Sequence, residues 1–235
     1  MLLSAAIVLS VVKSKILAAI DRVSEQVRMN SPGDLGNRRL DVRAFMVRSQ
    51  LAQTTSPVIV IGDSITEAAL FPSSVCGHTV VNAGIGGMTA GSYLAQFQQI
   101  TTNQPMDLAV IALGTNDASS ISNAETGFAA SYVALADFVA KDAPKTIFVG
   151  IPPIDANGAL AKGYFNLDSA SRINDTIHNL ARDRKIGFVD LRTEMTGPNL
   201  TVDGVHLDRA GYQLWSAAML SAIRSAIGCA ATSAR

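Results

Sequence analysis

The sequence contains few cysteines and few charged residues, and neither sign of charge is in excess. Two of its 235 residues are cysteine, and Lys plus Arg balance Asp plus Glu at 19 each. A chain without net charge and without a block of like charges lacks the basic surface that binds DNA or RNA. Cys76 and Cys229 fit no zinc or redox spacing, and no metal cluster or cofactor motif occurs elsewhere. We therefore expect no cofactor, no metal and no nucleic-acid partner.

A hydrophobic run long enough to cross a membrane is also missing. Residues 1–12 are apolar and uncharged, but Lys13 and Lys15 follow, and a span needs roughly 20 residues. A secretory signal carries its positive charge before the apolar run, not after it. Residues 11–29 also fit an amphipathic helix. Two interpretations stay open: a signal or membrane anchor within residues 1–20, and a helix that is soluble or lies on a membrane surface.

The remainder of the chain alternates between short apolar runs and longer segments with helical spacing. The runs are Val58–Ile61, Thr79–Val81, Leu108–Leu113, Thr146–Ile151 and Gly187–Leu191. The helical segments are Arg38–Gln53, Gly91–Ile100, Ala124–Lys141, Ser169–Lys185 and Arg209–Ile227. This alternation predicts an α/β fold, with a parallel sheet covered by helices on both faces. The turn-rich stretch Ser31–Gly36 divides the chain into an N-terminal segment, residues 1–36, and one domain, residues 37–235.

Glycines and polar residues gather where the predicted strands end. Gly62-Asp63-Ser64 follows the first strand, residues 82–89 the second and residues 114–117 the third, while Asp203-Gly-Val-His206 precedes the last helix. In an open α/β sheet these positions share the carboxyl edge, where ligands bind. Ser, Asn, Asp and His are the groups that acyl transfer by a serine nucleophile requires.

Two common enzyme motifs are absent, and each short block has an ordinary structural interpretation. No G-x-S-x-G occurs, which argues against the α/β-hydrolase elbow. Gly84-Ile-Gly86 begins like a dinucleotide loop, but Thr89 stands at the third glycine position. Taken alone, Ser64 fits a helix cap and residues 114–117 fit a turn.

Histidine is scarce enough to be informative, because the chain has three. His78 precedes the second predicted strand, at the edge opposite the site. His178 lies within a predicted helix, three residues after Asp175, where the two would form an ordinary surface pair. His206 lies in a glycine-containing loop at the start of a helix, so it is the candidate for function.

Together, in this order, the four blocks resemble those of the SGNH, or GDSL-type, serine hydrolases from about Pro57 to Ile227. The departures are Ile65 where leucine is commoner and Gly86 where many members carry serine. The resemblance implies a three-layer α/β/α sandwich with a five-stranded, parallel, flavodoxin-like sheet of order 2-1-3-4-5.

The resemblance also implies roles for individual residues. Ser64 would be the nucleophile, His206 the general base and Asp203 the carboxylate that holds the imidazole. The oxyanion would be bound by the N–H groups of Ser64 and Gly87 and by the side-chain amide of Asn116. We expect Asp63 to brace the turn through nearby backbone N–H groups, rather than to act as a rival catalytic acid.

These roles predict a serine-dependent carboxylic ester hydrolase that forms an acyl-enzyme. Short connections at the carboxyl edge favour short O-acyl groups such as acetyl, on a small molecule or a glycan. The longest irregular piece, residues 152–165, would form one wall with Tyr164 and Phe165. Alternatives with the same fold are a lysophospholipase or thioesterase, an acyltransferase, and a non-catalytic glycan-binding module. The sequence leaves the oligomeric state open.

The expected sheet order places the two cysteines at the same edge of the sheet. Cys76 just precedes the second strand and Cys229 follows the last helix, so both lie at the edge opposite the site. A disulfide between them is geometrically possible if their Cα atoms come within about 7 Å. It would indicate an oxidising compartment. With the apolar N-terminus, this predicts an exported or periplasmic protein, anchored to a membrane if residues 1–20 are retained as an anchor.

Overall fold

The structure is a computed structural model that describes residues 32–100, 104–120 and 123–229. Its contacts divide the chain into two units, Met1–Arg43 and Ala44–Arg235. Helix α2 (Pro32–Leu51) begins in the first unit and ends in the second. Residues 32–36, which the sequence suggested as a linker, are therefore helical. The predicted anchor, residues 1–20, lies outside the described residues, and within them every helix is too short or too polar to span a bilayer.

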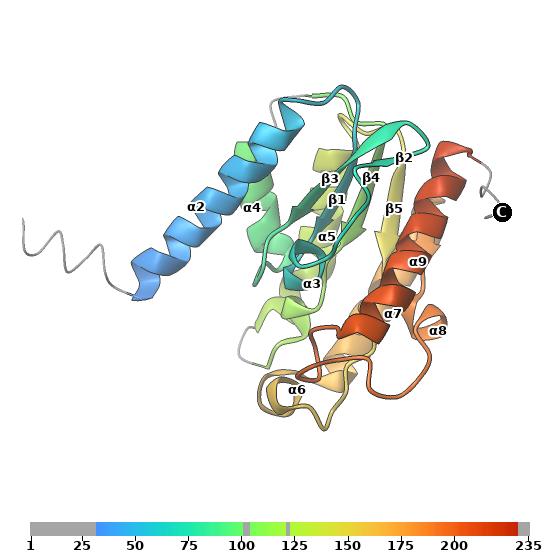
Figure 1. Ribbon diagram of the computed structural model, residues 1–235. Coiled ribbons are helices and arrows are strands. Elements are labelled where there is room, and N and C mark those ends of the chain that lie inside the picture. The colour runs from blue at the N-terminus through green and yellow to red at the C-terminus, as the bar shows by residue number, and fades with distance from the viewer. Residues whose placement is uncertain (1–31, 101–103, 121–122, 230–235) are drawn as a thin grey trace, which may run out of the picture. The chain divides into compact units, whose positions relative to one another are not determined.

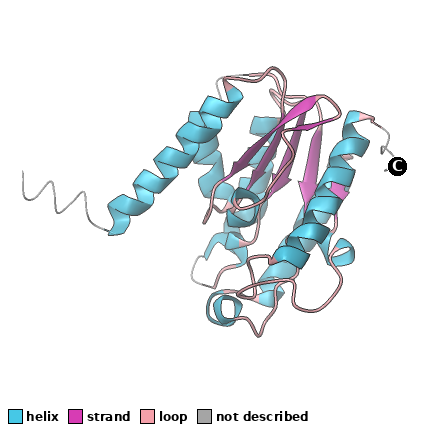
Figure 2. Ribbon diagram, viewed as in Figure 1, coloured by secondary structure: helices cyan, strands magenta, loops and turns pink. Residues whose placement is uncertain are grey.

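The second unit is built on a six-stranded sheet of order β2-β3-β1-β4-β5-β6 (Figures 1 and 2). The strands are β1 (Val58–Gly62), β2 (Ser74–Val75), β3 (His78–Gly84), β4 (Leu108–Ala112), β5 (Thr146–Val149) and β6 (Gly187–Val189). Five strands are parallel, and their order confirms the predicted 2-1-3-4-5. The prediction of five strands was wrong by one, because β2 pairs antiparallel with the start of β3. The Cys76–Gly77 turn joins them with φ of 52° and 86°, as a two-residue hairpin turn requires.

Helices cover both faces of the sheet, as predicted (Figure 1). One face carries α4 (Ala90–Ile100), α5 (Phe128–Val139) and α7 (Leu167–Arg184), and α9 (Arg209–Ile227) packs on the other. The short helices are α3 (Ser64–Glu67), α6 (Ala159–Tyr164) and α8 (Leu191–Glu194), with 3-10 turns at Asn116–Ala118 and Asn123–Gly127. Because both faces are covered, all five residues of β1 are buried.

The side chains of α9 fill one half of the core. Trp215, Met219 and Ile223 are at most 1% exposed and pack against Val58 and Val60 of β1. Spacings of four and four place these three residues on one stripe of the helix. A hydrophobic stripe against alternate residues of a strand fixes the direction of α9, which begins at the carboxyl edge of the sheet.

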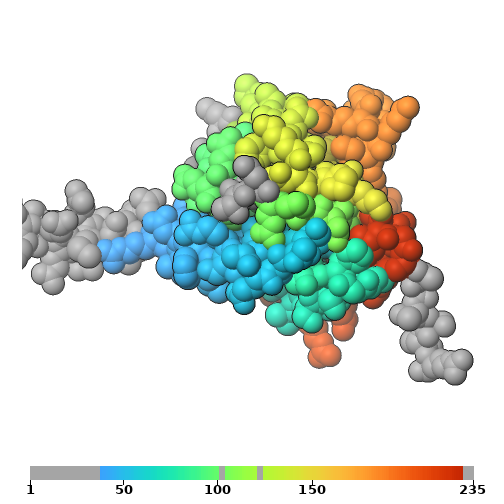
Figure 3. All heavy atoms as spheres, turned by 90° about the horizontal axis from the view of Figure 1, so that it is seen from above, coloured from blue at the N-terminus to red at the C-terminus, as the bar shows by residue number. Residues whose placement is uncertain are grey.

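A disulfide joins Cys76 and Cys229 at the edge opposite the carboxyl ends of the strands. Their Cα atoms are 6.3 Å apart, within bridging range. The view onto this edge shows the β2–β3 hairpin beside the end of α9 (Figure 3). The possibility raised from the sheet order is thus confirmed in the structure.

Strand register brings the functional loops together. Gly62, the last residue of β1, pairs with Gly84 of β3 on one side and with Ala112 of β4 on the other. Parallel strands that end at the same level send their following residues out at the same edge. The segments after Gly62, Gly84 and Ala112 therefore meet, although they are far apart in the sequence.

Candidate active site

Gly62, Asp63 and Ser64 each have a separate structural task at the end of β1. A Cβ atom on Gly62 would lie 1.9 Å from Thr66 Oγ1, so only glycine fits there. Asp63 is the N-cap of α3, and its Oδ1 accepts a hydrogen bond from Ile65 N at 2.9 Å. This confirms the bracing role predicted for Asp63. The cap is thus the aspartate, and Ser64, the first residue of the helix, keeps its hydroxyl group for another partner.

That partner is His206, from a loop 142 residues further along the chain. Ser64 Oγ and His206 Nε2 are 2.9 Å apart, and His206 Nδ1 lies 2.7 Å from Asp203 Oδ2. The structure therefore links the three predicted side chains in one hydrogen-bonded line, Ser64–His206–Asp203. The side chains of His206 and Asp203 are 37% and 29% exposed, so the line is open to a ligand from solvent.

The second oxygen of Asp203 is also fully used. Oδ1 accepts hydrogen bonds from the backbone N–H groups of Val205, at 3.0 Å, and His206, at 2.8 Å. Burial by itself would raise the pKa of Asp203, but the bonds from the His206 ring and from these N–H groups together hold the pKa below its usual value. Asp203 is thus an ionised acceptor with a fixed orientation, which keeps a proton on His206 Nδ1 and leaves Nε2 to accept one from Ser64.

Two backbone N–H groups remain without a hydrogen-bond partner among the described residues of the site. They belong to Ser64, at the start of α3, and to Gly87, in the loop after β3. Gly87 is exposed and has φ of 81°, a backbone conformation that favours glycine. Asn116, the third predicted donor, uses its Nδ2 in a bond to Met88 O at 3.1 Å. The structure thus ties Asn116 to the loop that carries Gly87.

The other two histidines lie away from this line. His78, at the start of β3, is bonded through Nδ1 to Asp107. His178 stacks on Phe188 with ring centroids 5.0 Å apart. The prediction of an Asp175–His178 pair was wrong, because Asp175 instead accepts a hydrogen bond from Arg192.

Sequence reasoning missed several residues that hold the site in place. Glu67 Oε2 accepts a hydrogen bond from Gly86 N, and Asp117 accepts one from Ala90 N. Tyr212 donates to Ile65 O at 2.9 Å. Burial, aided by the charge of Asp63, raises the pKa of Tyr212 to about 12, so its hydroxyl stays a donor. Asp117 belongs to the block of residues 114–117, but the partner that it binds depends on the folded chain.

The segment predicted as irregular, residues 152–165, contains helix α6 and packs directly on the loop of His206. The backbone N–H groups of Leu160 and Ala161 donate to Asp203 O at 2.9 and 3.4 Å. At its other end, Ser120 N donates to Tyr164 O at 2.8 Å. Helix α6 therefore connects the Asp203 loop with the segment that follows Asn116.

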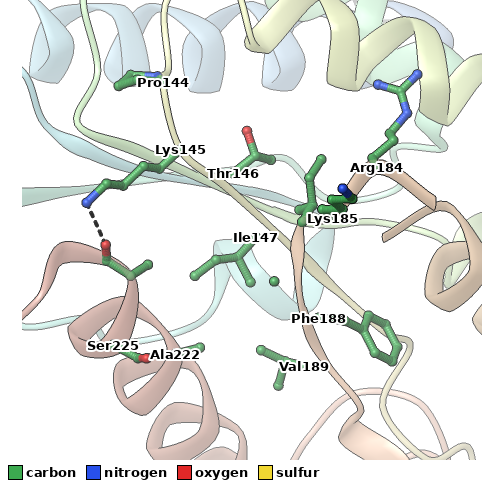
Figure 4. A pocket seen from close by; sticks show the side chains of 13 residues that line it. Pro144, Lys145, Thr146, Ile147, Arg184, Lys185, Phe188, Val189, Ala222 and Ser225 are labelled. Atoms are coloured by element: carbon green, nitrogen blue, oxygen red, sulfur yellow. Dashed lines mark hydrogen bonds between the residues drawn. The ribbon is translucent and has the colours of Figure 1, made fainter. Parts of the chain in front are cut away.

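Two hollows have different relations to the site. One, of about 10 Å³, is lined by residues that include Asp63, Thr66 and Trp215, but by neither Ser64 nor His206. The other, of about 620 Å³, lies at the opposite edge of the sheet, beside the starts of β5 and β6 and the end of α9 (Figure 4). There Lys145 Nζ donates to Ala226 O at 2.7 Å, and Arg184 pairs with Asp137. This second hollow is separate from the Ser64–His206–Asp203 line.

Comparison with known proteins was consistent with this geometry. The model of the GDSL-like lipase/acylhydrolase family matches residues 60–214. The chain is similar to an arylesterase from Vibrio mimicus, with 31% identity over 94 residues. That stretch covers 34% of this chain and 47% of the relative, so the chain spans about half of the relative's length.

Solved structures share the fold over most of the described chain. A GDSL-like lipase from Bacteroides thetaiotaomicron has a TM-score of 0.62 at 24% identity, covering 79% of this chain and 97% of its own. An acetylxylan esterase from Geobacillus stearothermophilus has a TM-score of 0.58 at 18% identity, with coverages of 77% and 98%. At these identities the two structures show the common fold.

Proposed function

Because the chain belongs to the GDSL-like lipase/acylhydrolase family, we propose that it is a serine-dependent carboxylic ester hydrolase with Ser64 as its nucleophile. The observation that carries the proposal is the hydrogen-bonded line Ser64–His206–Asp203, which joins residues from two distant segments. An ordinary capping serine needs no histidine on its hydroxyl group, and the helix already has a cap in Asp63.

In the first half of the reaction, His206 Nε2 takes the proton of Ser64 Oγ as the oxygen attacks the ester carbonyl. The ionised Asp203 stabilises the imidazolium that forms. The tetrahedral intermediate then collapses, and Nε2 donates the proton to the departing alkoxide, which leaves as the alcohol. In the second half, a water oxygen attacks the acyl carbon while His206 Nε2 takes one of the water protons. The new tetrahedral intermediate collapses by breaking the bond to Ser64 Oγ, which receives the proton from Nε2, and the carboxylic acid leaves.

The negative charge of the intermediate needs donors that are in place before the reaction. The free N–H groups of Ser64 and Gly87 supply two, and the Asn116 amide is the third. Ser64 N also lies at the start of α3, where backbone N–H groups have no helical acceptor. Losing one such donor typically costs about 10²–10³ in turnover.

We further propose that the substrates carry short acyl groups such as acetyl, on a small molecule or a glycan. The connections from β1 to α3, from β3 to α4 and from β4 to the 3-10 turn at Asn116–Ala118 are all short, and such short connections around Ser64 favour a small acyl group. A fold shared with an acetylxylan esterase is compatible with this choice. A series of p-nitrophenyl esters from acetate to palmitate tests it, and faster hydrolysis of the long chains would support a lysophospholipase or thioesterase instead.

Labelling with a fluorophosphonate tests the nucleophile. The wild-type protein should react at Ser64, and Ser64→Ala should lose both labelling and hydrolysis of p-nitrophenyl acetate while its circular dichroism spectrum is unchanged. Activity retained in Ser64→Ala would refute the mechanism. A wild-type protein that neither labels nor hydrolyses esters would support a glycan-binding module, and product formed on an added alcohol would identify an acyltransferase.

Export from the cytoplasm stays a prediction, supported by the Cys76–Cys229 disulfide. Membrane anchoring through residues 1–20 also stays a prediction, because these residues lie outside the described part of the chain. Cell fractionation distinguishes a soluble exported protein, a membrane-bound one and a cytoplasmic one.

A further inference from the structure

The loop between β3 and α4 presents a single free backbone N–H group, that of Gly87, among its described residues. The neighbouring N–H groups are all engaged in hydrogen bonds, namely those of Ile85, Gly86, Met88, Thr89 and Ala90. Gly87 itself lacks a side chain to anchor it, and a Cβ atom there would meet nothing within 4 Å. The position of its N–H group is therefore set by whatever holds the residues on either side.

Asp117 holds the loop from the end of β4. Its carboxylate is 1% exposed, and its two oxygens lie 3.2 and 3.1 Å from Ala90 N. Burial raises the pKa of Asp117 to about 6, so placing a carboxylate here costs free energy. The adjacent Asn116 binds Met88 O at 3.1 Å. Asn116 and Asp117 thus bind the backbone of Met88 and of Ala90, which lie one and three residues after Gly87.

Capping of α4 does not account for this arrangement. The helix already has a local cap, because Thr89 Oγ1 accepts from Ser92 N at 3.2 Å and Ser92 Oγ accepts from Thr89 N at 2.9 Å. Ordinary N-caps are supplied by the residue just before the helix. Asp117 comes from 27 residues further along the chain and connects two different strand ends.

We propose that Asp117 is a positioning residue that fixes the Gly87 N–H group where the oxyanion forms beside Ser64. The inference rests on the proposed function, because it assumes that Gly87 is an oxyanion donor. A donor stabilises a developing charge without reorganisation only if it is held in place beforehand. Without Asp117, the loop keeps the bond from Asn116 to Met88 O but loses its second attachment to the segment after β4, so the Gly87 N–H group is held less firmly before each turnover.

The test compares Asp117→Ala and Asp117→Asn with the wild-type protein, using p-nitrophenyl acetate. The alanine variant should lose about 10- to 100-fold in kcat, with KM changed less than about threefold, because the interaction strengthens only in the transition state. The asparagine variant keeps one acceptor oxygen for Ala90 N and should recover kcat to within about threefold of wild type. Ser92→Ala removes part of the local cap and should lower the melting temperature while kcat is kept.

A merely structural role gives a different pattern. If Asp117→Ala retains kcat within threefold, or if Ser92→Ala loses as much kcat as Asp117→Ala, the positioning role is overturned. If Asp117→Ala does not fold, Asp117→Ser takes its place, since serine is too short to reach Ala90. Failure of the proposed function is distinguishable, because it appears as an unlabelled wild-type protein or an active Ser64→Ala, irrespective of Asp117.

Discussion

At the scale of single residues, two carboxylates of the site have different roles. Asp63 and Asp203 are both carboxylates beside the Ser64–His206 pair, yet Asp63 caps a helix and Asp203 orients the histidine. Their partners decide these roles. Asp203 receives the ring N–H of His206, whereas Asp63 Oδ2 has no hydrogen-bond partner within the described chain.

Asp203→Asn tests the orienting role. The asparagine oxygen can still accept from the backbone N–H groups, but its NH₂ group then faces His206 Nδ1. That nitrogen must become an acceptor, which moves the ring proton to Nε2, where it blocks proton transfer from Ser64. We expect kcat for p-nitrophenyl acetate to fall by roughly 10³–10⁴ at neutral pH. Asp208→Asn is the matched control, since Asp208 caps α9 through Gly211 N, and it should retain kcat.

A loss of less than tenfold in Asp203→Asn would contradict the tautomer argument. Asp203 was predicted from the resemblance of Asp203-Gly-Val-His206 to the last block of the family, which is a local sequence pattern. Asp117 and Glu67 were not located, because their partners are backbone N–H groups of a loop that approaches them only in the folded chain. Local patterns thus predict the reacting groups better than the residues that hold them.

At the scale of elements, α6 holds the histidine loop by close backbone contact. A Cβ atom on Gly158 would lie 2.2 Å from Gly204 Cα, and one on Gly204 would lie 2.7 Å from Ala161 Cβ. Neither residue can carry a side chain unless the backbones separate. The contact allows the first N–H groups of α6 to reach Asp203 O, and these groups would otherwise lack an acceptor.

Gly158→Ala should therefore displace the loop of Asp203 and His206. We expect kcat to fall at least about tenfold, because misplacing a base by about 1 Å can cost that much or more. Gly163→Ala, in the same helix, is the control, since a Cβ atom there meets nothing within 4 Å. Steady-state kinetics and melting temperatures of both variants check the prediction, and equal kcat in the two would contradict it.

The elements that the sequence predicted incorrectly have physical explanations. Helix α2 begins at Pro32 although Pro and Gly suggested a linker, since proline is tolerated in the first turn of a helix. Helix α6 follows Pro152-Pro153 and itself contains Gly163, and such residues usually indicate loops. Strand β2 has only two residues, which are too few to show the alternation of apolar and polar residues that predicts a strand. The long buried strands and α9 were predicted well because their patterns extend over many residues.

At the scale of the whole molecule, the two edges of the sheet have different tasks. The carboxyl edge gathers the site, because β1, β3 and β4 end at the same level. The opposite edge carries the Cys76–Cys229 disulfide, which closes a loop across 153 residues of sequence separation. A cross-link over so long a loop restricts the unfolded chain strongly. The disulfide therefore stabilises the fold at the edge opposite the Ser64–His206–Asp203 line.

The buried carboxylates behind the site should make stability depend on pH. Burial raises the pKa of Asp63 from 3.8 to about 6, against the effect of its bond from Ile65 N. The folded state then binds a proton that the unfolded state has released between these values. The contribution of Asp63 is therefore greatest below about pH 4, falls as pH rises from about 4 to 6, and is constant above. At about 1.4 kcal/mol per pKa unit, the change is about 3 kcal/mol.

Urea unfolding of the wild-type protein and Asp63→Asn between pH 4 and 7.5 measures this contribution. Asparagine keeps an acceptor for Ile65 N but does not titrate, so the variant should gain about 3 kcal/mol relative to wild type over that range. Asp203, Asp190 and Asp137 have lowered pKa values, so their contributions are lost only as pH falls below about 4. Parallel pH profiles for the two proteins would show that Asp63 ionises in the folded state as it does in the unfolded chain.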